Sequence, residues 1–303
     1  MTSTGAPVTP GAPGGGPVPR RRAWIVAIRP PTLPAAVGPV LVGLAVAVAV
    51  APDRFRPLVA LASLGVALLL QIAANLANDL FDFRSGADAA DRLGPPRAAA
   101  LGLLIERELT AGIGIALGLA AVVGLYLVSV GGLPILALGI LAIVSALAYT
   151  GGPWPYGYHG LGELFVFVFF GLVAVAGTAY LQTDRLEPLG IAAAVPVGAL
   201  VTAILVVNNL RDIGPDTRAA KRTVAVMIGE RATVGEYLVL LAIGYGTPIA
   251  IVVAGWAVPT ALLPLVTLPL ALPLVGVVRA GGDPRRLNPV LRGTARLSLA
   301  HAL

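Results

Sequence analysis

The sequence predicts an all-α fold, a polytopic transmembrane bundle of about nine helices. Of its 303 residues, 57% are hydrophobic and 12% are charged, whereas about 25% of the residues of a soluble domain are charged. So few charges cannot cover a water-facing surface, and lipid is therefore the expected solvent. The apolar runs are spread along the chain, and the basic residues gather in alternate connections between them.

Nine apolar segments are candidates for membrane helices, because a span requires about 20 mostly apolar residues. In chain order they cover residues 32–51, 58–78, 111–130, 134–150, 161–181, 189–208, 234–254, 258–278 and 288–303. The fourth and the ninth are shorter than the others. Prolines inside several of these segments are compatible with membrane helices, since neighbouring helices can satisfy the carbonyl groups that proline leaves free.

Residues 1–19 differ from the rest of the chain, because they consist mainly of Gly, Pro, Ala, Thr and Ser. Such a segment cannot bury a core, and we expect it to be a disordered tail. It lacks the order of a secretory signal, in which basic residues precede a short apolar stretch; here the basic cluster Arg20–Arg22 follows the tail. Residues 20–303 are expected to form one transmembrane domain.

The basic residues predict the orientation of the bundle. Of the 21 Lys and Arg residues, all but Arg54, Arg56 and Arg185 lie in the N-terminal segment, in every second connection or near the C-terminus. Short loops rich in Lys and Arg stay in the cytoplasm, so the N-terminus and both polar clusters described next are expected there. This distribution explains the net charge of +6 without a nucleic-acid partner.

Two clusters of Asn and Asp residues stand at the ends of the second and sixth expected spans. Members of the first share one face of a helix through intervals of three and four residues: Asn75, Asn78 or Asp79, and Asp82. Members of the second are spaced by four: Asn208, Asp212 and Asp216. Oxygen ligands suit a hard cation such as Mg²⁺, and bunched carboxylates repel one another without a cation. With no cysteine and two histidines in the chain, a thiolate or multi-histidine metal site is excluded.

Basic residues accompany both clusters: Arg84, Arg92 and Arg97 near the first, and Arg211, Arg218, Lys221 and Arg222 near the second. Lys221 is the only lysine of the chain, and a compact ammonium group suits a phosphate contact. Carboxylates, Mg²⁺ and these cations together predict a diphosphate site at a membrane surface. Four residues are explained equally well by ordinary solvated ion pairs as by a role in this site: Asp91, Arg218, Glu106 and Glu108.

The two clusters read Asn78-Asp79-Leu80-Phe81-Asp82 and Asp212-Ile213-Gly214-Pro215-Asp216. They resemble the two Asp-rich motifs that the UbiA-type intramembrane prenyltransferases carry in two cytoplasmic loops of a nine-helix bundle. The first family motif often ends in a third Asp four residues further on. This chain has Gly86 at that position, and Asp88 is the nearest acidic residue.

Further segments are similar to the branch of this family that prenylates 1,4-dihydroxy-2-naphthoate. They cover residues 71–79, 86–97, 149–163 and 208–223, and the resemblance as a whole extends over about residues 24–300. It implies Mg²⁺-dependent transfer of a polyprenyl group from polyprenyl diphosphate to the naphthoate ring, with loss of CO₂. The implied product is demethylmenaquinone, made in the plasma membrane of a bacterium.

The resemblance also implies roles for individual residues. The metal ligands would be Asp79, Asp82, Asp212 and Asp216, and Lys221 would hold the diphosphate. The expected substrate-binding residues are Asn75, Asn78, Arg92, Arg97, Tyr149, Tyr156, Asn208 and Arg222. Among these, Arg97 is expected to bind the carboxylate of the acceptor, and the tyrosine rings, with Phe165, to stabilise an allylic cation. Glu163 is expected to be the general base. An equal alternative is that Glu163 only stabilises the start of a helix, where the helix dipole favours an acidic residue.

Two other functions are compatible with parts of the sequence. One is prenyl transfer to another acceptor, such as 4-hydroxybenzoate, homogentisate or a sugar phosphate. The other is membrane transport, whose sites tend to lie near the bilayer midplane on broken helices. The clusters here lie at one face and come with phosphate-binding cations, which favours the enzyme. The prenyl chain length and the oligomeric state do not follow from the sequence.

Overall fold

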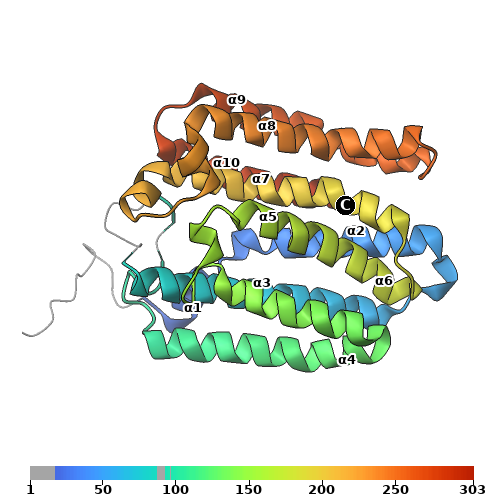
Figure 1. The fold of residues 1–303 in the computed structure, drawn as a ribbon, viewed down its shortest axis with the longest axis horizontal. Helices are drawn as coiled ribbons and strands as arrows, with labels where there is room; N and C mark the ends of the chain where they lie inside the picture. Colours follow the sequence, from blue (N-terminus) through green and yellow to red (C-terminus); the bar gives the residue numbers. More distant parts are fainter. Residues whose placement is uncertain (1–17, 87–92, 96) are drawn as a thin grey trace, which may run out of the picture.

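A computed structural model describes residues 18–86, 93–95 and 97–303, and the regular secondary structure of these residues is helical throughout. The all-α prediction is therefore confirmed. By length and composition, six of the described helices can cross a membrane, and a bent pair makes a seventh. One of the six contains two spans, as shown below, and with the short C-terminal helix the bundle is consistent with the nine expected (Figure 1).

The first part of the bundle begins with a short helix that the sequence did not predict. Helix α1 (Arg20–Ile28) packs its Ala23 and Ala27 against Leu76 and Leu80. A 3₁₀ turn, η1 (Pro30–Thr32), leads into α2 (Pro34–Val50), and the chain bends by 47° at this junction. A second 3₁₀ turn, η2 (Pro52–Arg54), precedes the long helix α3 (Pro57–Arg84).

Helix α4 (Glu106–Ala148) has 43 residues. A straight helix of this length would extend about 65 Å, twice the roughly 30 Å of the hydrocarbon core. Gly132 breaks it with φ 70° and ψ −158°, immediately before Pro134. Figure 1 shows the chain turning back at this point, and both halves lie along α3. Helix α4 is thus the third and fourth expected spans.

The fifth span is a composite of α5 (Gly162–Val166), a π-helical stretch η4 (Phe167–Ala176) and α6 (Gly177–Thr183). A 3₁₀ turn, η3 (Tyr156–Tyr158), precedes it. The π-helical stretch lies close against α7 (Pro188–Arg218). A Cβ on Gly171 would lie 2.8 Å from the Cα of Gly198, so this approach requires glycine.

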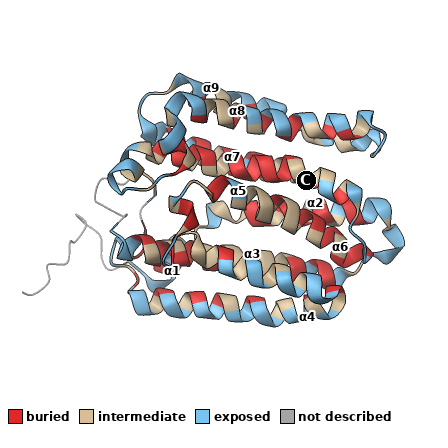
Figure 2. Ribbon diagram, viewed as in Figure 1, coloured by how far each residue is buried: buried red, intermediate tan, exposed pale blue. Residues whose placement is uncertain are grey.

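The remaining elements form the other side of the bundle (Figure 1). They are α8 (Val224–Val253), η5 (Pro259–Thr267), α9 (Leu268–Ala280), η6 (Pro284–Arg286) and α10 (Leu287–Ala302). Helix α7 is the central element, packed against α2, η4, α8 and α10. Figure 2 shows it mostly buried, whereas α4 and α9 expose apolar side chains, as expected where lipid is the solvent.

The long helices carry both motifs at their ends, as the spacing within each cluster predicted, whereas the family resemblance implied loops. Helix α3 continues to Arg84, and α7 continues through Pro215 to Arg218. Asn78–Asp82 and Asp212–Asp216 therefore occupy the last helical turns of α3 and α7. Helical continuation fixes the direction of each side chain, so neighbouring motif residues point to different sides.

Substitution Gly171→Ala is expected to lower the free energy of unfolding by about 1–3 kcal/mol, because the added methyl group overpacks the contact between η4 and α7. Gly118→Ala on α4 is the matched control, since a Cβ there meets no atom within 4 Å. Denaturation of the purified proteins in mixed micelles measures both. Equal stability of the two variants would show that the glycine contact is not required.

Candidate functional site

A cavity of about 920 Å³ extends between α2, α3, α4, η4 and α7. One end is polar and lies at the motif ends of α3 and α7. The polar side chains that line the cavity near the motifs are Asn78, Asp82, Arg97, Thr150, Tyr158, Asn208, Asn209, Asp212, Asp216, Arg218 and Lys221. Gln71 and Asn75 line it two to three turns earlier on α3, together with Arg29 and Thr32, and the remaining lining is mostly apolar. It therefore offers a charged head site and an apolar channel in one space.

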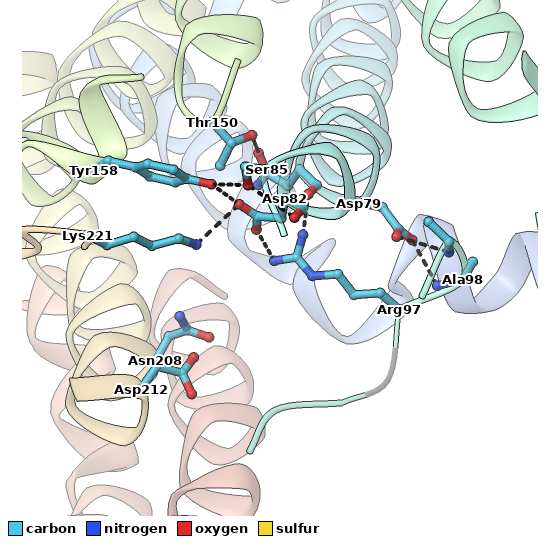
Figure 3. Close-up of polar contacts among 12 residues, drawn as sticks. Asp79, Asp82, Ser85, Arg97, Ala98, Thr150, Tyr158, Asn208, Asp212 and Lys221 are labelled. Atoms are coloured by element: carbon cyan, nitrogen blue, oxygen red, sulfur yellow. Dashed lines mark hydrogen bonds and ion pairs between the residues drawn. The ribbon is translucent and has the colours of Figure 1, made fainter. Parts of the chain in front are cut away.

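Asp82 is the centre of the polar end (Figure 3). Its side chain is 2% exposed and forms an ion pair with Arg97. The Nζ atom of Lys221 lies 3.2 Å from its Oδ1, and the hydroxyl of Tyr158 donates to the same oxygen. A buried carboxylate is costly unless it is paired and hydrogen-bonded. The three donors satisfy that requirement for Asp82.

Tyr158 links Asp82 to the connection between α7 and α8. The Lys221 ammonium lies 4.4 Å from the centre of the Tyr158 ring, within range of a cation–π interaction. The backbone N–H of Arg222 donates to the Tyr158 carbonyl at 2.8 Å. Burial and the neighbouring Asp82 raise the pKa of Tyr158 above its ordinary value, so its hydroxyl stays protonated and remains a donor.

The second motif presents Asn208, Asp212 and Asp216 to the same cavity. Behind them, the Arg211 side chain is 1% exposed, and its guanidinium donates to Asp212, to Asn208 Oδ1 at 2.8 Å and to Asn288 Oδ1 at 2.9 Å. A Cβ on Gly94 would lie 2.8 Å from this guanidinium. Buried Arg211 thus fixes the orientation of the motif from the side opposite the cavity.

The two motifs meet in space although they are far apart in the sequence. The contact between Lys221 and Asp82 joins residues 139 positions apart. Figure 3 shows Asn208 and Asp212 on α7 near the Asp82 cluster on α3. The prediction that both clusters face the same side of the bundle is confirmed.

Asp79 differs from the prediction. Its oxygens accept hydrogen bonds from the backbone N–H groups of Ala98 at 3.0 Å and Ala99 at 3.2 Å, and it does not line the cavity. Figure 3 shows it directed away from Asp82. Helix spacing allows either Asn78 or Asp79 on the face of Asn75 and Asp82, and the contacts with the backbone of residues 98 and 99 hold Asp79 away from the cavity. Of these two residues, Asn78 lines the cavity and Asp79 does not.

The asparagines of α3 hold the wall of the cavity in place. Thr150 donates to Asn78 Oδ1 at 2.9 Å, and the Asn78 carbonyl accepts from Arg97. Asn75 Nδ2 donates to the Ile28 carbonyl at 2.8 Å and to Thr32 Oγ1 at 2.9 Å. Both asparagines therefore connect α3 to other segments in addition to lining the cavity.

An aromatic wall stands beside the polar end, as the sequence predicted. The rings of Tyr149 and Tyr156 meet edge to face at 5.4 Å between centroids, and Tyr156 stacks on Phe165 at 4.1 Å. Phe169 continues the row at 6.0 Å from Phe165. All four rings line the cavity. Their faces can stabilise a cation formed next to the polar end.

Three other predicted residues lie differently from expectation, and a fourth falls outside the described part of the chain. Glu163 does not line the cavity; its Oε1 accepts from Asn209 Nδ2 at 2.7 Å, and Asn209 lines the cavity in its place. Arg97 forms an ion pair with Asp82 and donates a hydrogen bond to the Asn78 carbonyl. The Arg222 side chain is exposed and does not line the cavity. Arg92 lies outside the described residues.

Four residues of the site were not predicted from the sequence: Arg29, Thr150, Tyr158 and Asn209. Arg218, for which a surface ion pair was an equal alternative, also lines the cavity. Tyr158 and Asn209 lie inside the segments 149–163 and 208–223, which resemble the family branch. Their position in these segments could have identified them. Nothing local marks Arg29 or Thr150, because only packing brings them to the cavity.

The polar end fits a magnesium ion bound together with a phosphate ligand. Among the described residues, no three His, Cys, Asp or Glu side chains form a preformed metal group. Magnesium needs no such cage, since one or two carboxylates and substrate phosphates commonly hold it. Asp82, Asp212 and Asp216 supply hard oxygen ligands around one cavity, which is the donor type that Mg²⁺ prefers.

Comparison with known proteins identifies a family and several relatives that match most of the chain. The sequence matches the UbiA prenyltransferase family over residues 36–291. It is 43% identical over 282 residues to the 1,4-dihydroxy-2-naphthoate octaprenyltransferase of Mycobacterium tuberculosis, covering 92% of this chain and 94% of that one. The enzyme of the same name from Escherichia coli is 43% identical over 217 residues, 70% of each chain.

Two solved structures share the fold. A UbiA homolog from Aeropyrum pernix superposes with a TM-score of 0.68 at 17% identity, covering 94% of this chain and 96% of that chain. A UbiA homolog from Archaeoglobus fulgidus bound to GPP and Mg²⁺ superposes with a TM-score of 0.64 at 15% identity, covering 92% and 98%.

Substitution Asp79→Ala is expected to lower the free energy of unfolding by about 1–3 kcal/mol, because the buried N–H groups of Ala98 and Ala99 lose their acceptor. Thermal or denaturant unfolding in detergent measures the change. Asp53→Ala, at an exposed turn, is the control. Unchanged stability of Asp79→Ala would contradict the structural role of this carboxylate.

Proposed function

This chain belongs to the UbiA prenyltransferase family, and on that basis we propose that it transfers a polyprenyl group from polyprenyl diphosphate to 1,4-dihydroxy-2-naphthoate. The ring loses CO₂, and the product is demethylmenaquinone. Relatives that bear the name 1,4-dihydroxy-2-naphthoate octaprenyltransferase, at 36–43% identity, support this acceptor. They favour it over 4-hydroxybenzoate and over a transport function.

The observation that carries the proposal is the cavity with two chemically different ends. Its polar end combines the carboxylates of Asp82, Asp212 and Asp216 with the cations Arg97 and Lys221. Its apolar part matches a long hydrocarbon chain. A polyprenyl diphosphate has this division between a charged head and an apolar tail.

Asp82, Asp212 and Asp216 would hold Mg²⁺, with the amide oxygens of Asn78 and Asn208 beside them. Mg²⁺ held there would supply positive charge that stabilises the departing diphosphate. The structure of a UbiA homolog bound to DMAPP and Mg²⁺ supports this cofactor. We assign Asp79 a positioning role instead, because its oxygens are bonded to the backbone of residues 98 and 99.

Arg97 and Lys221 hold the diphosphate oxygens in this proposal, together with Arg218. Both donate to Asp82, so they lie where a diphosphate bound through Asp82 would arrive. Guanidinium and ammonium groups form strong, charge-assisted hydrogen bonds to phosphate. Tyr158 remains a neutral donor at the same position. The leaving group is therefore met by donors that are already oriented.

Cleavage of the C–O bond leaves an allylic cation at the first carbon of the prenyl chain. The faces of Tyr149, Tyr156 and Phe165 lie beside the polar end and stabilise this charge. These rings also exclude water, which would otherwise capture the cation. The electron-rich naphthoate ring then attacks the cation.

The apolar part of the cavity holds the prenyl tail. Leu125, Leu136 and Ile140 line the cavity and are also exposed on α4. The cavity thus reaches the surface of the bundle that faces lipid, and a tail longer than the cavity can extend into the bilayer. We place the chain in the plasma membrane of a bacterium, with the N-terminus and the motif ends in the cytoplasm, because the basic residues gather on that side.

Purified protein with Mg²⁺ and a polyprenyl diphosphate is expected to prenylate 1,4-dihydroxy-2-naphthoate and to release CO₂, measured by product chromatography. Asp82→Asn should lower kcat/KM by about a hundredfold or more, because the charge that holds the metal is lost. Asp184→Asn, which is exposed and pairs with Arg56, is the control. Turnover of 4-hydroxybenzoate without turnover of the naphthoate would contradict the proposal.

Glu163 is assigned a positioning role through Asn209. Glu163→Gln retains an oxygen that accepts from the Asn209 amide, so kcat should stay within about threefold of wild type. Glu163→Leu removes the acceptor and should lower kcat/KM by about tenfold. Steady-state kinetics distinguish the alternatives, because a general base would lose about a hundredfold or more in Glu163→Gln.

A further inference from the structure

Arg29 stands at the break between α1 and η1 in a left-handed backbone conformation, with φ 56° and ψ 66°. Non-glycine residues rarely adopt positive φ, because Cβ approaches the backbone too closely. Such strain persists only where the surrounding structure holds it, and it concentrates at functional sites. The Arg29 side chain lines the cavity.

Side chains of α3 hold this strained residue in place. Asn75 Nδ2 donates to the carbonyl of Ile28 at 2.8 Å and to Thr32 Oγ1 at 2.9 Å. Gln71 Nε2 also donates to Thr32 Oγ1, at 3.4 Å, and the Thr32 hydroxyl donates to the Arg29 carbonyl at 2.9 Å. The carbonyls on both sides of the Arg29 Cα are thus fixed by a partly buried polar network.

The position of this network along α3 separates Arg29 from the diphosphate site. Asn75 precedes Asp82 by seven residues, about 10 Å along the helix axis, and Gln71 precedes it by about 16 Å. Asp82 already has Arg97 and Lys221 as neighbouring cations. The Arg29 network therefore lies two to three turns along α3 from the motif end, toward the apolar part of the cavity, where the proposed function puts the reacting prenyl carbon.

We propose that Arg29 binds the carboxylate of the aromatic acceptor, an inference that rests on the proposed function. The prenyl tail is apolar and needs no cation, so the acceptor carboxylate is the one remaining anion of the reaction. A guanidinium group binds a carboxylate through paired, charge-assisted hydrogen bonds. The separation along α3 leaves room for an aromatic ring between Arg29 and the diphosphate. Arg97, which the sequence suggested for this role, pairs with Asp82 and belongs to the diphosphate site in the proposed function.

The test uses two acceptors that differ only in the carboxylate, 1,4-dihydroxy-2-naphthoate and 1,4-dihydroxynaphthalene. Arg29→Asn removes the guanidinium, while asparagine tolerates the left-handed backbone. This variant should lose about tenfold to a hundredfold in kcat/KM for the naphthoate. It should change the naphthalene reaction and the KM for polyprenyl diphosphate by less than about twofold, since neither interaction involves the carboxylate.

Arg84→Asn is the matched control, because Arg84 forms a surface ion pair with Glu106 and does not line the cavity. Arg29→Lys keeps the charge and should recover part of the loss. Isothermal calorimetry with each acceptor in detergent provides a readout that is independent of turnover. The same selective loss of naphthoate affinity is expected there.

Equal losses with both acceptors, or a raised KM for polyprenyl diphosphate, would overturn the assignment of Arg29. Failure of the proposed function has a different signature. In that case the wild-type protein would not prenylate the naphthoate at all, and calorimetry on wild type and Arg29→Asn would still decide whether Arg29 recognises a carboxylate.

Discussion

The structure depends on the compensation of one buried negative charge, the carboxylate of Asp82 within a membrane helix bundle. Ionisable groups at such positions are expensive and must be paired. Arg97, Tyr158 and Lys221 provide the pairing, and each comes from a different connection between helices. The need to satisfy Asp82 therefore brings three distant segments together, and in doing so it assembles the head site.

The same arrangement explains why one cavity has a charged end and an apolar part. The last turns of α3 and α7 carry the carboxylates, while the earlier turns of these helices line the cavity mostly with apolar side chains. Buried Arg211 fixes the Asp212 side, and the Asn75 network fixes the strained turn at Arg29. Charged substrate groups are thus held near one end of the bundle, and the hydrocarbon chain lies between helices that are already adapted to lipid.

Much of the site was predictable, and the differences between the expected and the observed contacts have one kind of cause. The residue types, the spacing of the motifs and the aromatic wall follow from the sequence. The prediction assigned Asp79 to the metal, Glu163 to proton transfer and Arg97 to the acceptor carboxylate. In each case the side chain is engaged elsewhere: with backbone N–H groups, with Asn209 and with Asp82. Spacing along a helix leaves open which of two neighbouring residues faces a cavity.

The sequence by itself determined the lipid environment, the approximate spans and the common side of the two motifs. These properties are sums over local composition, because hydropathy and the distribution of Lys and Arg act segment by segment. Only the tertiary structure decided that Asn78 and not Asp79 faces the cavity, and that Arg29 and Asn209 belong to it. The rotation of each helix is set by packing against segments far away in the sequence, and no local pattern records that rotation.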